Sequence, residues 1–412
     1  RIMVLLAHPF GNANVRAVLD ALQRSDSLAR FVTTIAWSKG SGQEFAPKIR
    51  EAFRRNYDLP ASKIDTYPFR ESIRLLAGRV RLQRLIEHET GWASVDKVWQ
   101  SLDRETARRL RRGKYPNVRC VYCYEDCAEQ IFLTARDLNL KRAYDLPIAY
   151  WETVRSLLRQ EIERYPDWEP TLGATRDSEE KLSRKTRELE LAEMVVCPSE
   201  FVFSSLPSKI RDQKRCSVIP FGTPCCELEE ESKQLNEKHT LRVLFAGALT
   251  QRKGLADLFA AMRLIKSNEI ELVVMGSLLK PLNWYRQRLA NFTYEPPRAH
   301  NDVLRLMKSC DVLVLPSIVE GRALVQQEAM ACGLPVIATR NAGADDLIVD
   351  SETGFLVPIR APEAIAEKLS WCVQNRRLLA GMGIAAQKRA RHLTWRAYGD
   401  SIVEAARKLI SE

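Results

Sequence analysis

The sequence lacks the features that define several large classes of protein. No apolar run in its 412 residues approaches the roughly 20 residues that cross a bilayer, which predicts that no segment spans a membrane. Residues 1–10 are only a short apolar run, and we expect a first buried strand there and not a signal peptide. The ten cysteines are scattered, several within apolar segments, which is typical of free thiols in a reducing compartment. We therefore expect a cytoplasmic protein.

Motifs for common cofactors are also missing. No Gly-x-Gly-x-x-Gly follows a strand, which argues against a nicotinamide-dependent oxidoreductase. Cys120, Cys123 and Cys127 have no second cysteine pair or histidine cluster nearby, so we expect no metal site there. The net charge of +11 indicates an anionic partner, which could be nucleic acid, a phosphorylated substrate or an acidic membrane. Because the chain has no recognisable nucleic-acid module, we expect no nucleic acid as a partner.

The second half of the chain alternates short apolar strands with helices. Strands are expected at 241–247, 270–277, 311–317, 334–340 and 354–358, with a helix at 324–332 and others between the remaining strands. This alternation is typical of a parallel, doubly wound sheet that is covered on both faces. It predicts one Rossmann-like domain.

The first half is less regular but contains similar parts. Apolar strands are expected near 3–8, 31–37, 119–124, 141–147 and 194–199, which favours a second parallel-sheet domain. We thus predict an α/β chain of two Rossmann-like domains that face a cleft. We expect an N-terminal acceptor domain at 1–222, a polar linker at 223–240 and a donor domain at 241–390. A C-terminal helix at 391–412 is expected to pack back on the first domain.

Two glutamates stand at the edge of the predicted C-terminal sheet. Glu320 follows the strand at 311–317, and Glu328 lies eight positions later, inside the next helix. Ligands of parallel sheets bind at the carboxyl ends of the strands, and amides at a helix start suit a diphosphate. Solvated helix-end charges are the alternative, but Glu328 sits in an apolar segment where an unpaired carboxylate would be costly. The loop that would hold phosphate comprises Gly321, Arg322, Ala323 and Leu324.

Two cations follow the first strand of the same domain. Gly247 ends that strand, and Arg252 and Lys253 precede a helix. Positive charge placed there would stabilise a departing diphosphate as a sugar bond breaks. Surface Arg-Lys pairs are common, so the prediction depends on the two glutamates at the same sheet edge.

Together these motifs resemble the family 4 glycosyltransferases, which have the GT-B fold. The residues that carry the resemblance are GALTQRKG at 247–254, Pro316-Ser317 with the E-x7-E pair Glu320 and Glu328, GLPVI at 333–337, TGFLVP at 353–358, and upstream CPSEF at 197–201 and VIPFGTP at 218–224. The resemblance covers about 190–400 well and the first half only in outline.

The resemblance implies a role for each matching residue. Glu320 would contact the donor sugar, Glu328 the ribose, Arg252 with Lys253 the diphosphate, and Tyr294 the base. The family retains configuration at the sugar carbon and is typically metal-independent, and this chain has no Asp-x-Asp pair. The resemblance therefore implies a nucleotide diphosphate sugar as donor, no metal cofactor, and a glycan or lipid-linked glycan as acceptor. A binding or scaffold protein that has lost activity is the alternative.

The chain departs from the family pattern at three places. Ala248 stands where the family often has arginine, and Arg322 replaces the usual aromatic residue. The family's histidine after a middle strand of the first domain is not evident in YDLPIAYW at 144–151.

Acceptor-side candidates come from strand ends of the first domain. Gly11, Asn12 and Asn14 follow the first strand and could bond sugar hydroxyls, although a plain turn explains them equally. Glu125 and Asp145 follow other strands of the same sheet and could line the cleft.

One segment combines apolar and basic residues at helical spacing. Residues 69–86 could lie on an anionic membrane, which would make the protein peripheral to the inner membrane face. We favour an ordinary helix that packs its apolar face on the core.

Overall fold

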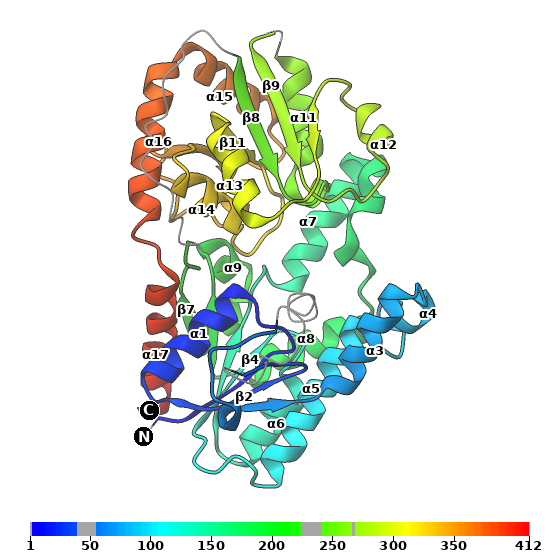
Figure 1. The fold of residues 1–412 in the computed structure, drawn as a ribbon, viewed down its shortest axis with the longest axis vertical. Coiled ribbons are helices and arrows are strands. Elements are labelled where there is room, and N and C mark those ends of the chain that lie inside the picture. Colours follow the sequence, from blue (N-terminus) through cyan, green and yellow to red (C-terminus); the bar gives the residue numbers. More distant parts are fainter. Residues whose placement is uncertain (1, 39–54, 224–239, 266–267, 412) are drawn as a thin grey trace.

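The chain folds into two domains, each built on a parallel sheet. The structure is a computed structural model that describes residues 2–38, 55–223, 240–265 and 268–411. The N-terminal domain lies below the C-terminal domain in Figure 1, and α7 and the C-terminal helices pass between them. The prediction of an α/β chain with two Rossmann-like domains is confirmed.

The N-terminal sheet has seven parallel strands in the order β3-β2-β1-β4-β5-β6-β7. Its strands are β1 (Val4–Ala7), β2 (Leu28–Thr33), β3 (Ile64–Thr66), β4 (Cys120–Tyr124), β5 (Lys141–Asp145), β6 (Met194–Cys197) and β7 (Arg215–Val218). Successive side chains of β1 enter different cores: Val4 and Leu6 join one apolar cluster, and Leu5 and Ala7 join another. Both faces of the sheet are therefore buried, as the continuous apolar strands predict.

Helices cover both faces of this sheet. They are α1 (Ala13–Arg24), α3 (Pro68–Arg79), α4 (Gln83–Ile86), α5 (Val95–Arg111), α6 (Glu129–Asp137), α7 (Trp151–Arg164), α8 (Glu179–Leu191), α9 (Glu200–Ser205) and α10 (Ser208–Gln213), with the short 3-10 turns η1 (Ala61–Lys63), η2 (Pro166–Thr171) and η3 (Gly173–Arg176). Serines cap several of them: Ser94 accepts a hydrogen bond from an amide of α5, and Ser178 accepts one from an amide of α8.

The C-terminal sheet has six parallel strands in the order β10-β9-β8-β11-β12-β13. Its strands are β8 (Leu241–Ala246), β9 (Ile270–Met275), β10 (Thr293–Glu295), β11 (Val312–Leu315), β12 (Val336–Thr339) and β13 (Gly354–Val357). The helical elements are η4 (Gln251–Lys253), α11 (Leu255–Leu264), α12 (Leu282–Arg286), α13 (His300–Lys308), α14 (Leu324–Ala331), η5 (Arg340–Ala342), α15 (Pro362–Gln374) and α16 (Arg376–Ala390).

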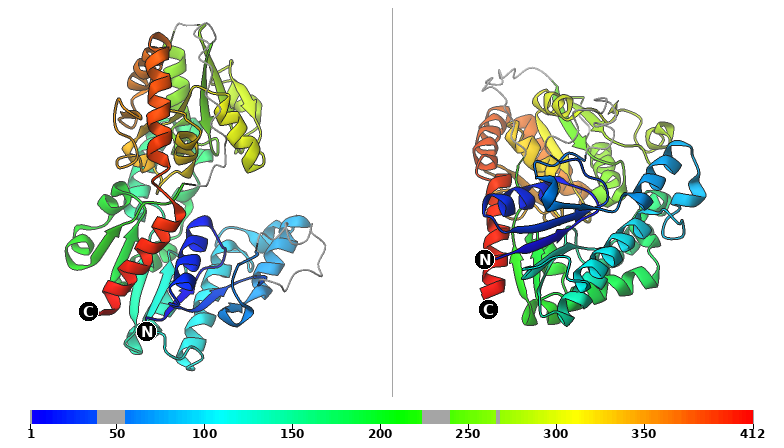
Figure 2. Two further views of the ribbon diagram at one scale, coloured as in Figure 1. Left: turned by 60° about the vertical axis from the view of Figure 1, so that its left-hand side comes forward. Right: turned by 60° about the horizontal axis from the view of Figure 1, so that its bottom comes forward.

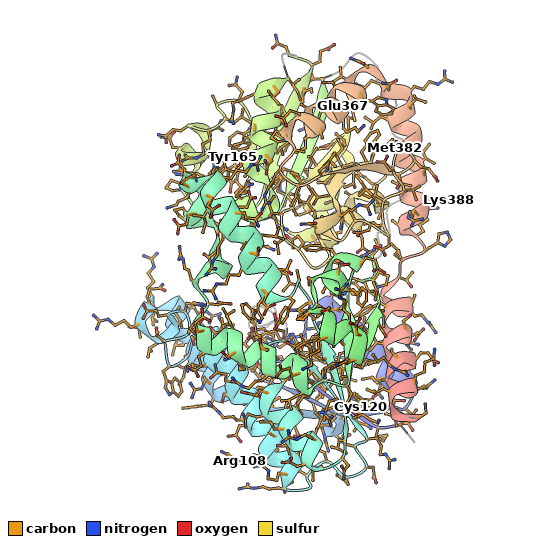
Figure 3. All side chains as sticks on the ribbon, turned by 180° about the vertical axis from the view of Figure 1, so that it is seen from behind. Arg108, Cys120, Tyr165, Glu367, Met382 and Lys388 are labelled. Carbon is orange, nitrogen blue, oxygen red and sulfur yellow. The ribbon has the colours of Figure 1, made fainter. Side chains whose placement is uncertain are left out.

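The N-terminal half reaches onto the C-terminal domain through α7 and η2. Trp168 of η2 is buried in the C-terminal core, with its ring 5.0 Å from that of Trp284 and 6.0 Å from that of Phe259. Figure 3 shows Tyr165, at the end of α7, beside the C-terminal domain. The segment from α7 to η2 therefore joins the two cores.

The chain crosses back to the N-terminal domain at its end. Helix α17 (Trp395–Ser411) lies along α1, as both views of Figure 2 show. Tyr398 and Ile402 of α17 share an apolar cluster with Val4 and Leu6. Before α17, the amide of Thr223 donates to the carbonyl of Leu393. Most of the predicted linker, 224–239, lies outside the described residues.

Several element predictions need correction. β3, β7 and β10 were not predicted, because their sequences IDT, RCSV and TYE are not apolar runs. The strand expected at 31–37 instead ends at Thr33. The single helix expected over 69–86 is broken between α3 and α4, where Arg81 adopts a φ of 58°. The apolar face of α3 also points to solvent, so the favoured interpretation of core packing is wrong.

Candidate active site

The ends of β8 and β9 in the C-terminal sheet lie close together because each is followed by a glycine, which has no side chain. Gly247 follows β8 and Gly276 follows β9, with φ values of 145° and 146° that only glycine adopts readily. A Cβ on Gly276 would lie 1.7 Å from the Gly247 carbonyl oxygen. A Cβ on Gly247 would lie 2.8 Å from Cδ of Lys253. The glycines therefore leave bare backbone at the carboxyl edge, directly beneath a lysine side chain.

The carboxylate of Glu320 lies between the two predicted cations. Its Oε1 is 2.6 Å from Nζ of Lys253 and 3.1 Å from Nη1 of Arg252. Burial alone would raise the pKa of Glu320, but the charges of Lys253 and then Arg252 outweigh it and lower the pKa below its usual value. The carboxylate therefore stays ionised at neutral pH and balances part of the positive charge.

Hydrogen bonds fix the loop of the cations to the loop of the glutamate. The backbone carbonyl of Arg252 accepts from the amide of Ile318 at 2.9 Å, and its guanidinium donates to the carbonyl of Val319 at 3.1 Å. The side chain of Thr250 caps η4 by accepting from the amide of Arg252. The relative positions of the three charges are thus set by backbone contacts as well as by their mutual attraction.

The support behind η4 was not predicted from the sequence. Gln251 is fully buried, and its amide group donates to Glu161 at 2.7 Å and to Asp257 at 2.8 Å. Glu161 belongs to α7 and also accepts from Arg360. The only signal was the position of Gln251 directly before Arg252, because its partner Glu161 is 90 positions away in the sequence.

A second bond joins η4 to the N-terminal half. The hydroxyl of Thr250 donates to the carbonyl of Thr171 in η2 at 2.7 Å. The same segment that places Trp168 in the C-terminal core therefore holds the cation loop from behind.

Glu328 and Tyr294 lie on two different elements of the C-terminal domain, α14 and β10. Glu328 is in α14, 16% of its side chain is exposed, and Nδ1 of His300 lies 3.7 Å from its Oε1. Burial raises the pKa of Glu328, partly opposed by His300. The Tyr294 hydroxyl donates to the Gly276 carbonyl at 3.0 Å, so this tyrosine adjoins the glycine pair.

The loop at Arg322 differs from the predicted phosphate site. The side chain of Arg322 is buried and donates to Gln327 at 2.9 Å and to Asp346 at 2.7 Å. The amide of Ala323 donates to the carbonyl of Ala342, so we correct the expectation that it holds phosphate. Leu324 begins α14, where the first amides of a helix lack partners within that helix.

The two domains touch closely beside Glu320. A Cβ on Gly321 would lie 1.7 Å from the carbonyl oxygen of Pro147, which follows β5 of the N-terminal domain. The hydroxyl of Ser199 donates to the Gly321 carbonyl at 2.6 Å. The segment at 144–151, where the family's histidine was not evident, therefore packs on this loop together with Ser199.

The residues predicted after β1 have different environments. Gly11 lies against Tyr57, whose hydroxyl would be 2.3 Å from an added Cβ. Asn12 is exposed at the start of α1, and its side chain makes no capping bond. Asn14 is buried and hydrogen-bonds Tyr398 of α17. Only Asn12 of these asparagines presents its side chain to solvent.

Asp145 and Glu125 are engaged within the N-terminal domain. Asp145 is 1% exposed and accepts from the hydroxyls of Tyr122 at 2.7 Å and Tyr398 at 3.4 Å, which corrects its expected position in the cleft. Burial raises the pKa of Asp145 to about 7. Glu125 is buried 3.2 Å from Nζ of Lys185. These hydroxyl and lysine partners come from elements that the sequence pattern does not place together.

The structure also bears on the cysteines and on membrane crossing. Cys120 and Cys123 belong to separate apolar clusters on the two faces of the sheet, so they do not form a ligand pair. Across the described parts of the chain, no helix combines the length and apolar character that a bilayer crossing requires.

The two parallel-sheet domains have the GT-B fold of glycosyltransferases. Residues 227–389, about two fifths of the chain, match the family "Glycosyl transferases group 1". An uncharacterized glycosyltransferase of Methanocaldococcus jannaschii is 27% identical over 225 residues, which cover 54% of this chain and 60% of that protein. The chain spans about half the length of the curated relatives that it matches. The predicted relationship to the family 4 type of glycosyltransferase is confirmed.

Solved structures share the whole fold. Sucrose-phosphate synthase from Thermosynechococcus elongatus superposes with a TM-score of 0.66 at 18% identity, over 100% of both chains. HepE of Anabaena, solved in complex with UDP-glucose, superposes with a TM-score of 0.61 at 15% identity, over 99% of this chain and 100% of that one. At these identities the likeness shows the common fold.

Proposed function

We propose that the protein is a retaining glycosyltransferase that moves a sugar from a nucleotide diphosphate sugar to a glycan or lipid-linked glycan. The observation that carries the proposal is the convergence of Arg252 and Lys253 on Glu320 at the carboxyl edge of the C-terminal sheet. Parallel sheets bind ligands at this edge. Glycine backbone beside Lys253 leaves space for a diphosphate to approach.

The two cations would act on the leaving group. When the bond between the sugar carbon and the phosphate oxygen breaks, the electron pair stays on the nucleoside diphosphate. Arg252 and Lys253 are held in place before the reaction and would stabilise that charge without reorganising. Since they supply the positive charge, we propose that transfer needs no metal ion.

The acidic residues would orient the donor. Glu320, ionised beside the cations, can accept hydrogen bonds from sugar hydroxyls, and Glu328 can accept them from a ribose. Tyr294, next to Gly276, would lie against the base. HepE holds UDP-glucose, which makes UDP-sugars the first donors to test.

A cytoplasmic location agrees with the state of the cysteines. Each of the eight cysteines that the structure describes is a free thiol, and six of them are buried. Such thiols persist without oxidation in a reducing compartment.

A thermal-shift screen with UDP-, GDP- and ADP-sugars tests donor binding, because a ligand that binds only the folded state raises the melting temperature. A donor that stabilises the protein is then incubated with glycan and lipid-linked acceptors, and NMR of the product reports the configuration at the sugar carbon. We expect one nucleotide to be selected and the configuration to be retained. Inversion would refute the retaining mechanism, and selective binding without transfer to any acceptor would favour an inactive binding protein.

A further inference from the structure

The exposed face of α3 carries large apolar side chains, and its buried face carries a glutamate. Phe69, Leu76 and Val80 recur at the spacing of one helix face, and they are 71%, 60% and 54% exposed. The side chains of α3 that face the domain are those of Glu71 and Ala77. Glu71 is completely buried, and its carboxylate is paired with Arg55 and Arg74. The helix is therefore anchored through an ion-paired glutamate, which leaves its apolar side in contact with water.

Neighbouring residues extend this apolar surface. Trp92 is 44% exposed and packs edge-on against Phe69, with the ring centroids 5.9 Å apart. The guanidinium of Arg70 lies 4.2 Å from the centroid of the Trp92 ring. We use the name α3–α4 patch for this surface, which comprises Phe69, Leu76, Val80, Leu82, Leu85 and Trp92. Isolated apolar side chains on a surface are common, but six large exposed ones between residues 69 and 92, two of them in ring contact, indicate an interaction site.

Arginines surround the α3–α4 patch. Arg79 and Arg81 are exposed at the break between α3 and α4, and Arg84 is exposed on α4. Figure 1 and both views of Figure 2 show α3 and α4 projecting from the edge of the N-terminal domain.

We propose that the α3–α4 patch docks the protein on an anionic lipid surface. Phe69, Leu76 and Val80 would enter the boundary between headgroups and acyl chains, as the apolar face of an interfacial helix does. The arginines would remain at the level of the anionic headgroups. Trp92, with an apolar ring under a guanidinium, is a residue of the type that membrane interfaces favour. A second copy of the chain would bring two arginine rims together, so charge complementarity selects lipid.

This docking is independent of the sugar-transfer proposal, because it uses no residue of the C-terminal site. Its test is co-sedimentation of the full chain with vesicles of equimolar phosphatidylcholine and phosphatidylglycerol, and with vesicles of phosphatidylcholine alone. We expect binding to the anionic vesicles that is roughly tenfold or more tighter than to the neutral ones. About 1 M sodium chloride, with a screening length near 3 Å, should weaken it.

Paired substitutions separate the patch from general surface effects. Phe69→Ser with Leu76→Ser should lower binding to anionic vesicles by roughly tenfold or more, since the inserted apolar area is lost. Leu378→Ser with Ile384→Ser is the matched control, because these α16 residues are equally exposed, at 61% and 72%. All four side chains face solvent, so melting temperatures should confirm that both variants fold.

The charge requirement has its own variant and control. Arg81→Glu with Arg84→Glu should abolish the preference for anionic vesicles. Arg111→Glu with Arg112→Glu, at the end of α5 near Arg108 in Figure 3, should leave it intact. Equal binding by the serine variant and its control would overturn the proposal, as would absence of vesicle binding by the unaltered chain. A dimer in analytical ultracentrifugation that Phe69→Ser with Leu76→Ser dissolves would assign the patch to self-association instead.

Discussion

Nζ of Lys253 lies 2.6 Å from Oε1 of Glu320, although the two residues are 67 positions apart in the chain. The carboxylate is ion-paired with the lysine, and Nη1 of Arg252 lies 3.1 Å from the same carboxylate oxygen. A diphosphate that enters the site offers these cations a competing anion. The contact is therefore a point where donor binding and the position of Glu320 are coupled.

The first prediction concerns Glu320→Gln, which keeps the shape of the side chain and removes its charge. Sugar transfer should fall by roughly a hundredfold or more, because a contact at the reacting sugar is lost. Binding of the nucleoside diphosphate alone should be equal or tighter, since a competing carboxylate no longer neutralises Lys253. Transfer assays and calorimetry measure the two effects separately.

Glu367→Gln provides the control for this change, because that side chain is 73% exposed and lies far from the site in Figure 3. Wild-type transfer by the Glu320 variant would show that the carboxylate has no part in the reaction.

The second prediction concerns Gln251→Ala. The substitution leaves Glu161 and Asp257 without the amide that donates to both, and a buried group without its partner costs about 1–3 kcal/mol. We expect a lower free energy of unfolding and weaker nucleoside diphosphate binding, because η4 loses its rear support. Gln287→Ala, at an exposed position, should change neither quantity. Lowered stability with unchanged binding would show that Gln251 does not position the cations.

The third prediction concerns the close contact between the domains. In Gly321→Ala the new methyl group would meet the Pro147 carbonyl at 1.7 Å, so the backbone must move. Overpacking of this kind costs about 1–3 kcal/mol, which denaturant unfolding can measure. Gly381→Ala is the control: nothing lies within 4 Å of its Cβ, and it should stabilise α16 by up to about 1 kcal/mol. Equal stability of the two variants would contradict the close packing at Gly321.

The fourth prediction concerns the pH dependence of stability at Asp145. Burial raises the pKa of Asp145 from 3.8 to about 7, so ionisation disfavours the folded state. Its contribution to stability is complete below the unfolded pKa and is lost as the pH rises through the folded pKa. Asp145→Asn cannot ionise, so between about pH 4 and pH 8 it should lose less stability than the wild type, by up to about 4 kcal/mol.

Denaturant unfolding across this pH range tests the prediction. The pH dependence of the unfolding free energy that remains in Asp145→Asn should come from groups such as Asp103, because burial also raises the pKa of Asp103 to about 7. Parallel pH profiles for the wild type and Asp145→Asn would contradict the assignment.

The sequence predicted the parts of this protein that depend on local patterns. Buried strands such as β1 and β11 are continuous apolar runs, and parallel strands place Glu320 and the Arg252-Lys253 pair at one edge whatever the details of packing. The short edge strand β10 carries too few residues for a pattern to identify it.

Other features depend on contacts between distant segments. The enclosure of Asp145 by Tyr398, the support of Gln251 by Glu161, and the packing of Pro147 on Gly321 join residues that no local periodicity relates. The outward apolar face of α3 has a similar origin, because the ion pairs of Glu71 with Arg55 and Arg74 decide which side of the helix is buried.

The most direct test is calorimetric titration of UDP, GDP and ADP into the wild type and into Arg252→Ala with Lys253→Ala. Arg305→Ala, at a side chain that is 77% exposed, is the control. Charge-assisted hydrogen bonds contribute about 1.5–3 kcal/mol each, so the double variant should bind its preferred diphosphate roughly a hundredfold or more weakly while the control binds normally. Equal affinity of the double variant and the wild type would contradict the assignment of this sheet edge as the donor site.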